Sequence, residues 1–316
     1  RQARTSAALR SLPMASESRR LVILALIANA GIAVTKFIAA AISGSSAMLS
    51  EGIHSLADSG NQLFLLRGHA ASRFEASVQH PYGRGKEMYF WSFMVAVFLF
   101  VGGSVISVIS GVAKIRDPLG PGDEGFWLSM AVLAIAAAFE GFIALRPALK
   151  EFNRQRAGRT FRKTIKESKD PALLVVLFED TAAMVGLLTA AVGLVIARVT
   201  ENAVWDGIAS VLIGALLAGV AWVLAVEMKS LLIGESATRE ERAKIRAAAL
   251  SVADARTVDR LLTMQLAPDE ILVTMDVEFD EGIGGDRIEA AVVEIEANIS
   301  LAVPEATRIF VEPVDR

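Results

Sequence analysis

Long apolar stretches are the feature that most limits the fold of this chain. A helix needs about 20 apolar residues to cross a bilayer. With 53% hydrophobic residues and a mean hydropathy of +0.46, the composition is more apolar than that of ordinary soluble domains. The sequence therefore predicts an integral membrane protein whose core is an all-α bundle of six transmembrane helices. The expected spans are 20–42, 46–66, 89–114, 126–146, 172–197 and 203–226.

Lysine and arginine residues predict the orientation of these helices. They gather before the first stretch, between the second and third, and between the fourth and fifth, where residues 146–169 hold nine of them. The opposite loops, at 43–46, 116–125 and 200–203, are short and poor in cations. Because cytosolic loops carry the excess of Lys and Arg, we expect both termini to lie in the cytosol.

The composition of the chain changes near residue 234. Residues 235–316 hold 9 Lys and Arg against 18 Asp and Glu, a net charge of −9; the whole chain carries −3, so the preceding residues carry +6. Such a shift indicates a separate acidic domain. The predicted parts are an N-terminal cytosolic leader or tail at 1–18, a transmembrane domain at 19–234 and a cytosolic domain at 235–316.

The C-terminal part has the pattern of a small α+β domain. Thr238, followed three residues later by Glu241, is a capping-box signature for the start of a helix. Alternating apolar and polar residues then predict two strands joined by a tight turn, and an amphipathic helix and a last strand follow. This order predicts a ferredoxin-like αββαβ fold, and so small a sheet favours pairing with a second copy. The strands and helix are expected at 257–267, 270–280, 285–302 and 307–314.

A stripe of polar residues interrupts the second apolar stretch. Its members are spaced by three, four and three residues, which places them on one face of a helix. Ionisable side chains inside a bilayer are rare and usually mark an ion or substrate path. The alternative interpretation is a structural hydrogen-bonded pair of His54 and Asp58. The stripe consists of Glu51, His54, Asp58 and Asn61.

The fifth apolar stretch contributes Glu179 and Asp180 from a different helix. If the two helices pack together, one imidazole and two or three carboxylates converge inside the membrane. Nitrogen and oxygen ligands without a thiolate suit a divalent transition metal that is not held permanently. The sequence therefore predicts a metal site between the second and fifth helices.

Three other polar residues of the apolar stretches have simpler explanations. Lys36 lies near the end of its stretch, where its side chain is expected to reach the membrane surface. Asp206 opens the sixth stretch, where a carboxylate caps the free N–H groups of a helix. Glu140 either hydrogen-bonds between helices or lines the path.

Four segments of the sequence resemble the cation diffusion facilitator family, whose members move zinc and related divalent metals against protons. They are SGSSAMLSEGIHSLADSGNQ at 43–62, HPYGRGKEMYFWSF at 80–93, FEDTAAMVGLL at 178–188 and DGIASVLIGALLA at 206–218. The resemblance implies that His54 and Asp58 occupy the family's metal-binding HxxxD positions and that Asp180 is the ligand on the fifth helix. It also implies a cytosolic C-terminal domain that dimerises.

One departure from the family pattern affects the expected ligand set. The family pairs the fifth-helix aspartate with a His or Asp four residues earlier, where this chain has Val176. Either Glu179 or a water completes the site, and the resemblance ranks Asp180 above Glu179. Glu51 and Asn61 are candidate path or gate residues. Residues 235–316 contain no His or Cys, so no tight regulatory metal site is expected there.

These features together predict a homodimeric antiporter that exports Zn²⁺ from the cytosol in exchange for protons, by alternating access. Mn²⁺, Co²⁺, Fe²⁺, Ni²⁺ and Cd²⁺ are alternative substrates. The expected location is the inner membrane of a bacterium, and we expect no organic cofactor, no nucleic-acid partner and no enzymatic reaction. The alternatives are an intramembrane metalloenzyme, for which the sequence offers no HExxH motif, and a passive channel, which needs a continuous pore.

Overall fold

The computed structural model describes residues 15–118, 123–156 and 158–314. The chain divides into two compact units, each assembled from several segments of the sequence. Most of the predicted leader at 1–18 lies outside the described residues, and the first helix begins at Ala15. Unit 1 contains Arg1–Leu63, Phe98–Ala144 and Glu179–Gly219, and unit 2 contains Phe64–Val97, Leu145–Phe178 and Val220–Arg316.

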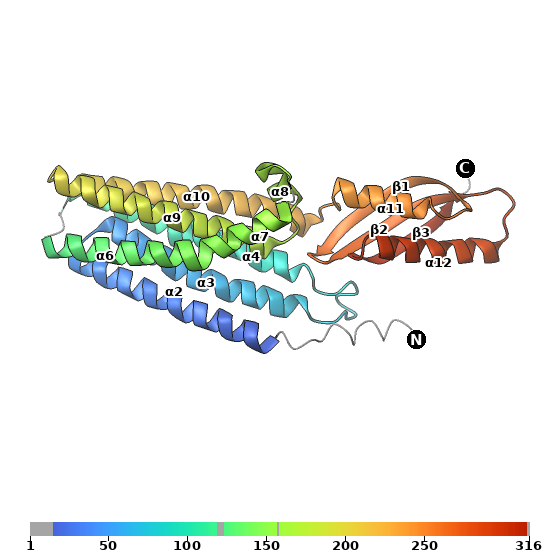
Figure 1. Cartoon of the computed structure of the whole chain (residues 1–316), viewed down its shortest axis with the longest axis horizontal. Coiled ribbons are helices and arrows are strands. Elements are labelled where there is room, and N and C mark those ends of the chain that lie inside the picture. Colours follow the sequence, from blue (N-terminus) through green and yellow to red (C-terminus); the bar gives the residue numbers. More distant parts are fainter. Residues whose placement is uncertain (1–14, 119–122, 157, 315–316) are drawn as a thin grey trace. The chain divides into compact units, whose positions relative to one another are not determined.

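Long helices occupy the stretches that the sequence predicts as membrane spans (Figure 1). In the third and fourth, a π-helical segment joins two α-helical parts. A short helix, α8 (Phe161–Glu167), follows the fourth. The long helices are α2 (Ala15–Ser43), α3 (Ser46–Ser72), α4 (Glu87–Phe98) with η1 (Leu99–Val105) and α5 (Ile106–Arg116), α6 (Asp123–Phe139) with η2 (Glu140–Leu145) and α7 (Arg146–Arg156), α9 (Pro171–Val199) and α10 (Val204–Ile233).

Four helices in the described part of the chain are long and apolar enough to cross a membrane. This confirms an integral membrane protein with an apolar helical core. The first two predicted spans are helical as expected, but of α2 only Asn29–Ser43 counts as a shorter apolar helix. Helix α3 is less apolar because it carries the polar stripe. The four spans are Glu87–Arg116, Gly125–Arg154, Pro171–Val199 and Val204–Ile233.

Asp206, in the first turn of α10, stabilises the start of α3. Its fully buried carboxylate accepts hydrogen bonds from the backbone N–H groups of Ser46 at 2.7 Å and Ala47 at 3.3 Å, and from the Ser45 hydroxyl at 2.6 Å. The first N–H groups of a helix have no partner within that helix. From the sequence, Asp206 was expected to cap the start of its own helix, α10. The hydrogen bonds instead show that it caps the start of α3.

Glycine residues allow α5 and α10 to approach each other closely. A Cβ atom added at Gly207 would lie 2.8 Å from the carbonyl oxygen of Gly111, and one added at Gly111 would lie 2.6 Å from the carbonyl oxygen of Gly207. Gly214 likewise faces the carbonyl oxygen of Ser104, at 2.9 Å from an added Cβ. Small residues are the usual means of close helix packing in membranes. These contacts fix α10 against the third membrane helix within unit 1.

Unit 2 contains an apolar core around the buried ring of Tyr89 in α4. Leu174 of α9 and Leu224 and Met228 of α10 are its fully buried partners. The core therefore joins the first turns of α9 to the second half of α10 by apolar packing, which stabilises in proportion to the apolar area removed from water.

The C-terminal part contains α11 (Arg239–Ala249), β1 (Ala255–Ala267), β2 (Glu270–Phe279), α12 (Gly285–Ala302) and β3 (Ala306–Val314). The predicted order of helix, two strands, helix and strand is therefore present. The predicted capping box forms as well: the Thr238 hydroxyl accepts a hydrogen bond from the Glu241 N–H, and the Glu241 carboxylate accepts one from the Thr238 N–H.

A three-stranded sheet in the order β1, β2, β3 carries the core of this part. Strand β1 pairs antiparallel with β2, and β2 pairs parallel with β3. Alternate residues of β2, including Ile271, Val273 and Met275, are buried against Ile245 of α11 and Ile295 of α12. The period-two pattern of the sequence thus identified the face of β2 that is covered.

Candidate metal site

The polar stripe of α3 lies on the buried face of the helix within unit 1. Glu51, His54 and Asn61 are fully buried, and Asp58 is 6% exposed. Leu56 and Leu63, on other faces of α3, are both more than half exposed. The spacing of three, four and three residues therefore predicted correctly that these four side chains turn inward together.

His54 and Asp58 lie next to each other, one helical turn apart. The Nδ1 atom of His54 is 3.4 Å from Oδ1 of Asp58. Neither imidazole nitrogen has a hydrogen-bond partner among the described residues, and the same holds for Oδ1 of Asp58. Buried polar atoms are normally satisfied, because desolvation without a partner is costly. In a structural hydrogen-bonded pair these atoms would bond to each other. Nitrogen and oxygen atoms that are buried without such bonds are instead typical of side chains that bind a metal ion.

Glu179 brings the second carboxylate to the stripe from α9. Its side chain is buried and interacts with the side chains of Asp58 and Asn61. Asp180 is only half-buried, and its charged neighbours are Glu179 and Glu140. Helix α9 is regular around this point, so adjacent side chains point about 100° apart. The side chain that meets Asp58 therefore belongs to Glu179, the residue that the resemblance ranked second.

Asp180 nevertheless remains a candidate ligand. Its Oδ2 atom is buried without a hydrogen-bond partner among the described residues. Among the residues that the structure describes, no group of three or more His, Asp or Glu side chains is placed to hold a metal ion. The side chain of Asp58 lies between those of His54 and Glu179, and the three form a row. Joint binding of one ion would require these three side chains to move closer together.

Glu51 forms a buried ion pair with Lys36 of α2. The Lys36 Nζ atom lies 3.1 Å from Oε2 of Glu51 and donates a hydrogen bond of 2.7 Å to the Ser55 hydroxyl. Lys36 is fully buried, so the expectation that it reaches the membrane surface is wrong. The helix ends at Ser43, close to the expected residue 42, so its length is not the cause of the error. The cause is that the partner of Lys36, Glu51, lies on another helix.

Glu140 is a further buried carboxylate that sequence reasoning left without a clear role. It is 6% exposed, whereas the neighbouring Phe142 and Ile143 are more than 60% exposed. It begins the π-helical segment η2, and such segments often occur at functional sites. Its charge lies within electrostatic range of Asp58, Glu179 and Asp180. No residue pattern in the sequence predicted the π-helical segment that Glu140 begins.

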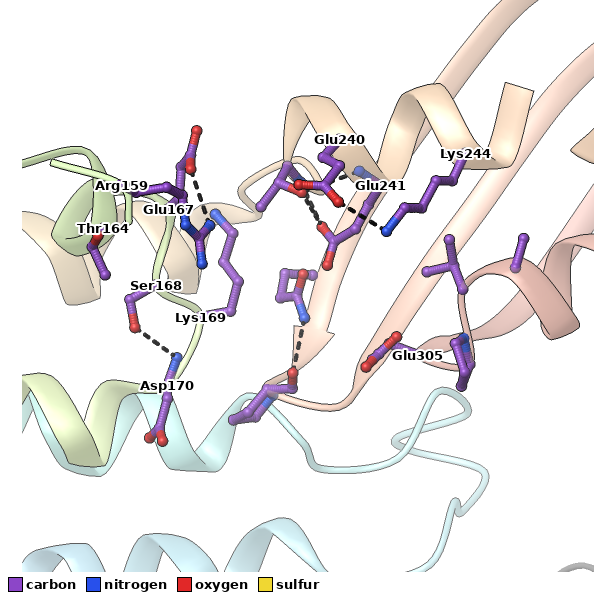
Figure 2. A pocket seen from close by; sticks show the side chains of 16 residues that line it. Arg159, Thr164, Glu167, Ser168, Lys169, Asp170, Glu240, Glu241, Lys244 and Glu305 are labelled. Atoms are coloured by element: carbon purple, nitrogen blue, oxygen red, sulfur yellow. Dashed lines mark hydrogen bonds and ion pairs between the residues drawn. The ribbon is translucent and has the colours of Figure 1, made fainter. Parts of the chain in front are cut away.

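A polar cleft of about 510 Å³ lies in unit 2, and none of the predicted metal ligands lines it (Figure 2). Two ion pairs join charged side chains of its lining: Arg159 with Glu167 at 3.3 Å, and Lys244 with Glu240 at 2.9 Å. The hydrogen bond from Lys244 lowers the pKa of the exposed Glu240 carboxyl. These pairs indicate a solvated polar surface rather than a second ion site.

The membrane part of the chain matches a known protein family. The cation efflux transmembrane domain model matches residues 22–233. Over 263 residues, covering 83% of this chain and 46% of the relative, the chain is 31% identical to the mouse (Mus musculus) protein named proton-coupled zinc antiporter SLC30A9, mitochondrial. It is 34% identical to metal tolerance protein C4 of Arabidopsis thaliana over 232 residues, which cover 72% of this chain and 50% of that protein.

A bacterial relative is more distant but aligns over most of both chains. The manganese efflux system protein MneP of Bacillus subtilis is 23% identical over 261 residues, covering 78% of this chain and 81% of that protein. The chain spans about half the length of the mouse and plant relatives. Because the family model covers both helices that carry the candidate ligands, the chain belongs to the cation efflux family, also called the cation diffusion facilitators, whose members are transporters rather than enzymes.

Proposed function

We propose that this protein exports divalent metal ions, Zn²⁺ foremost, in exchange for protons. The observation that carries the proposal is the row of His54, Asp58 and Glu179, buried between two helices and rich in polar atoms without partners. Membership of a family of divalent metal transporters supports the same reading. Two carboxylates and one imidazole offer the donor atoms that a divalent transition metal prefers.

Proton exchange follows from the chemistry of these ligands. Imidazole and carboxylates bind a metal only when they are deprotonated, so metal binding releases protons. Protons that reach the site from the opposite side then favour release of the metal. Rocking of the helices around a fixed site would expose it to each side in turn. The mouse relative is named a proton-coupled zinc antiporter, which supports this coupling.

The single nitrogen ligand supports zinc as the preferred substrate. Imidazole suits Zn²⁺, whereas ligand sets made only of oxygen suit harder ions such as Mn²⁺. Relatives of this chain carry names for both zinc and manganese transport. We therefore propose Zn²⁺ as the main substrate, with Mn²⁺, Co²⁺, Fe²⁺, Ni²⁺ and Cd²⁺ as competitors.

The proposed working form is a homodimer in the inner membrane of a bacterium. All six predicted spans cross the bilayer, both termini lie in the cytosol, and residues 235–316 form a ferredoxin-like dimerisation domain. The basic segment between α6 and α9 supports this orientation under the positive-inside rule. On the sheet, exposed Leu262 and Phe310 offer apolar surface that a second copy could cover.

Transport in proteoliposomes tests the proposal. Purified protein is reconstituted, and Zn²⁺ entry is followed with and without an imposed proton gradient, at a membrane potential clamped with valinomycin and potassium. We expect an outward proton gradient to drive Zn²⁺ uptake above equilibrium in the wild type, and His54→Ala to abolish it. Zinc flux that ignores the proton gradient would indicate a passive channel, and the absence of any flux would refute transport.

A further inference from the structure

Lys36 is a fully buried lysine about two turns before the end of α2. Its ammonium is fully buried and contacts Glu51 at 3.1 Å and Ser55 at 2.7 Å, both on α3. A charged side chain at this depth is costly even when it is paired. Two apolar residues of similar volume would join α2 to α3 without that cost, so the pair calls for an explanation beyond helix packing.

Glu51 is placed to reach an ion held by His54. It precedes His54 by three residues on the same face of α3, which places the two side chains one turn apart. Its Oε2 atom faces Lys36, whereas Oε1 is buried without a hydrogen-bond partner among the described residues. On that side the carboxylate lies against Gly186 of α9, where an added Cβ would collide with Oε1. One oxygen of Glu51 is therefore held by Lys36, and the other has no hydrogen-bond partner among the described residues.

The charge of Lys36 also acts on the rest of the site. It lies within electrostatic range of His54, Asp58 and Glu140 as well as Glu51. Five carboxylates lie in this region, and Lys36 acts on three of them: Glu51, Asp58 and Glu140. The affinity of a carboxylate site for a divalent ion rises with the number of ligand charges. A transporter must release its ion, so too many free carboxylates would trap it.

We propose that Lys36 sets the metal affinity of the site by acting as a counter-cation to Glu51. It neutralises Glu51 and keeps that carboxylate out of the ligand set, so that the ion is held by His54, Asp58 and the carboxylates of α9. This inference rests on the proposed function, because it assumes that a divalent metal occupies the site. It assigns to Lys36 the tuning of affinity rather than the binding of metal.

Metal affinity of charge-removing variants tests the inference. Zn²⁺ binding is measured by calorimetry on the full-length protein in detergent, for Lys36→Gln, Glu51→Gln and the double variant. Glutamine can still hydrogen-bond to the partner side chain, which favours folding. We expect Lys36→Gln to bind Zn²⁺ about tenfold more tightly, because Glu51 becomes available. We expect Glu51→Gln to bind about tenfold more weakly, because an unneutralised ammonium remains beside the site, and the double variant to lie between the two.

A matched control comes from a second buried lysine of unit 1. Lys114 of α5 donates a hydrogen bond of 2.6 Å to the carbonyl oxygen of Gly44. The cation that acts on Glu51, His54 and Asp58 is Lys36 and not Lys114. Lys114→Gln should therefore leave Zn²⁺ affinity within about threefold of the wild type, which is less than the tenfold shift expected at Lys36. A similar gain in affinity in both variants would overturn the inference, because loss of any buried lysine would then suffice.

Tighter Zn²⁺ binding in Lys36→Gln together with weaker binding in Glu51→Gln supports the inference. Affinities within about threefold of the wild type in both variants would overturn it and leave the Lys36–Glu51 pair a structural role. If Lys36→Gln does not fold, Glu51→Gln decides alone, and unchanged or tighter binding overturns the inference. His54→Ala in the same assay separates failure of this inference from failure of the proposed metal site. If His54→Ala no longer binds Zn²⁺ and Lys36→Gln binds it like the wild type, only the role of Lys36 is overturned. If His54→Ala still binds Zn²⁺, the proposed site itself is overturned.

Discussion

Glu179 and Asp180 are neighbours in α9, yet their side chains have different surroundings. Glu179 is buried against Asp58 and Asn61, while Asp180 is half-buried beside Glu140. The sequence could not decide between them, because the choice depends on the rotation of α9 about its axis relative to α3. In contrast, the inward face of α3 followed from the spacing of its own residues.

The roles of these two carboxylates can be separated by alanine substitution. We expect Glu179→Ala to weaken Zn²⁺ binding by at least about tenfold, because Glu179 is the carboxylate that faces Asp58. The loss should be at least as large as the loss in Asp180→Ala. Calorimetry of both variants in detergent provides the measurement. A loss confined to Asp180→Ala would show that α9 rotates before it binds metal.

His54 supplies the nitrogen of the site, and its replacement tests metal preference. We expect His54→Asp to shift the preference between Zn²⁺ and Mn²⁺ by about tenfold towards Mn²⁺, because the ligand set becomes all oxygen. Competition between the two ions in vesicle uptake gives the ratio. Asn61→Asp is a useful comparison, since it adds a carboxylate on the same face but keeps the imidazole. Normal transport with unchanged preference in His54→Asp would mean that His54 does not bind the ion.

At the scale of helices and strands, the lengths of the apolar stretches and the residues typical of helix ends predicted most of the elements. The six stretches became helices, and the capping box at Thr238 formed as predicted. Three of the helices extend further than expected, to Ser72, Arg156 and Ile233 instead of 66, 146 and 226. The π-helical segments η1 and η2 were not foreseen, because the sequence carries no residue pattern that distinguishes a π-helical turn from an α-helical one. The burial of Lys36 was missed for a related reason: its partner Glu51 lies on another helix.

Close packing of α10 against α5 gives a prediction at this scale. Gly207→Ala should lower the free energy of unfolding by about 1 to 3 kcal/mol, because the new methyl group would overlap the backbone of α5. Gly219→Ala in the same helix is the matched control, since a Cβ at Gly219 meets nothing within 4 Å. It should be neutral or stabilising by up to about 1 kcal/mol. Thermal unfolding in detergent measures both, and equal effects would contradict the packing.

At the scale of the whole molecule, the composition separated the apolar helical part from the acidic C-terminal part. The C-terminal part forms a three-stranded sheet with an apolar core. The boundary near residue 234 stays a prediction, because the compact unit that contains this sheet also includes Phe64–Val97 and Leu145–Phe178. Assembly was less predictable from sequence, because pairing depends on surface shape as well as on exposed apolar residues such as Leu262 and Phe310. Homodimerisation and alternating access therefore remain proposals about the full molecule.

Proton release on metal binding tests the central claim, that one buried site binds either a divalent metal or protons. Zn²⁺ is titrated into the detergent-solubilised protein in two buffers with different ionisation enthalpies, and the difference in heat gives the number of protons released. The account predicts at least about one proton released per Zn²⁺ in the wild type, and none in His54→Ala with Asp58→Ala, because the metal then has no site. Tight Zn²⁺ binding by the wild type without proton release would contradict it.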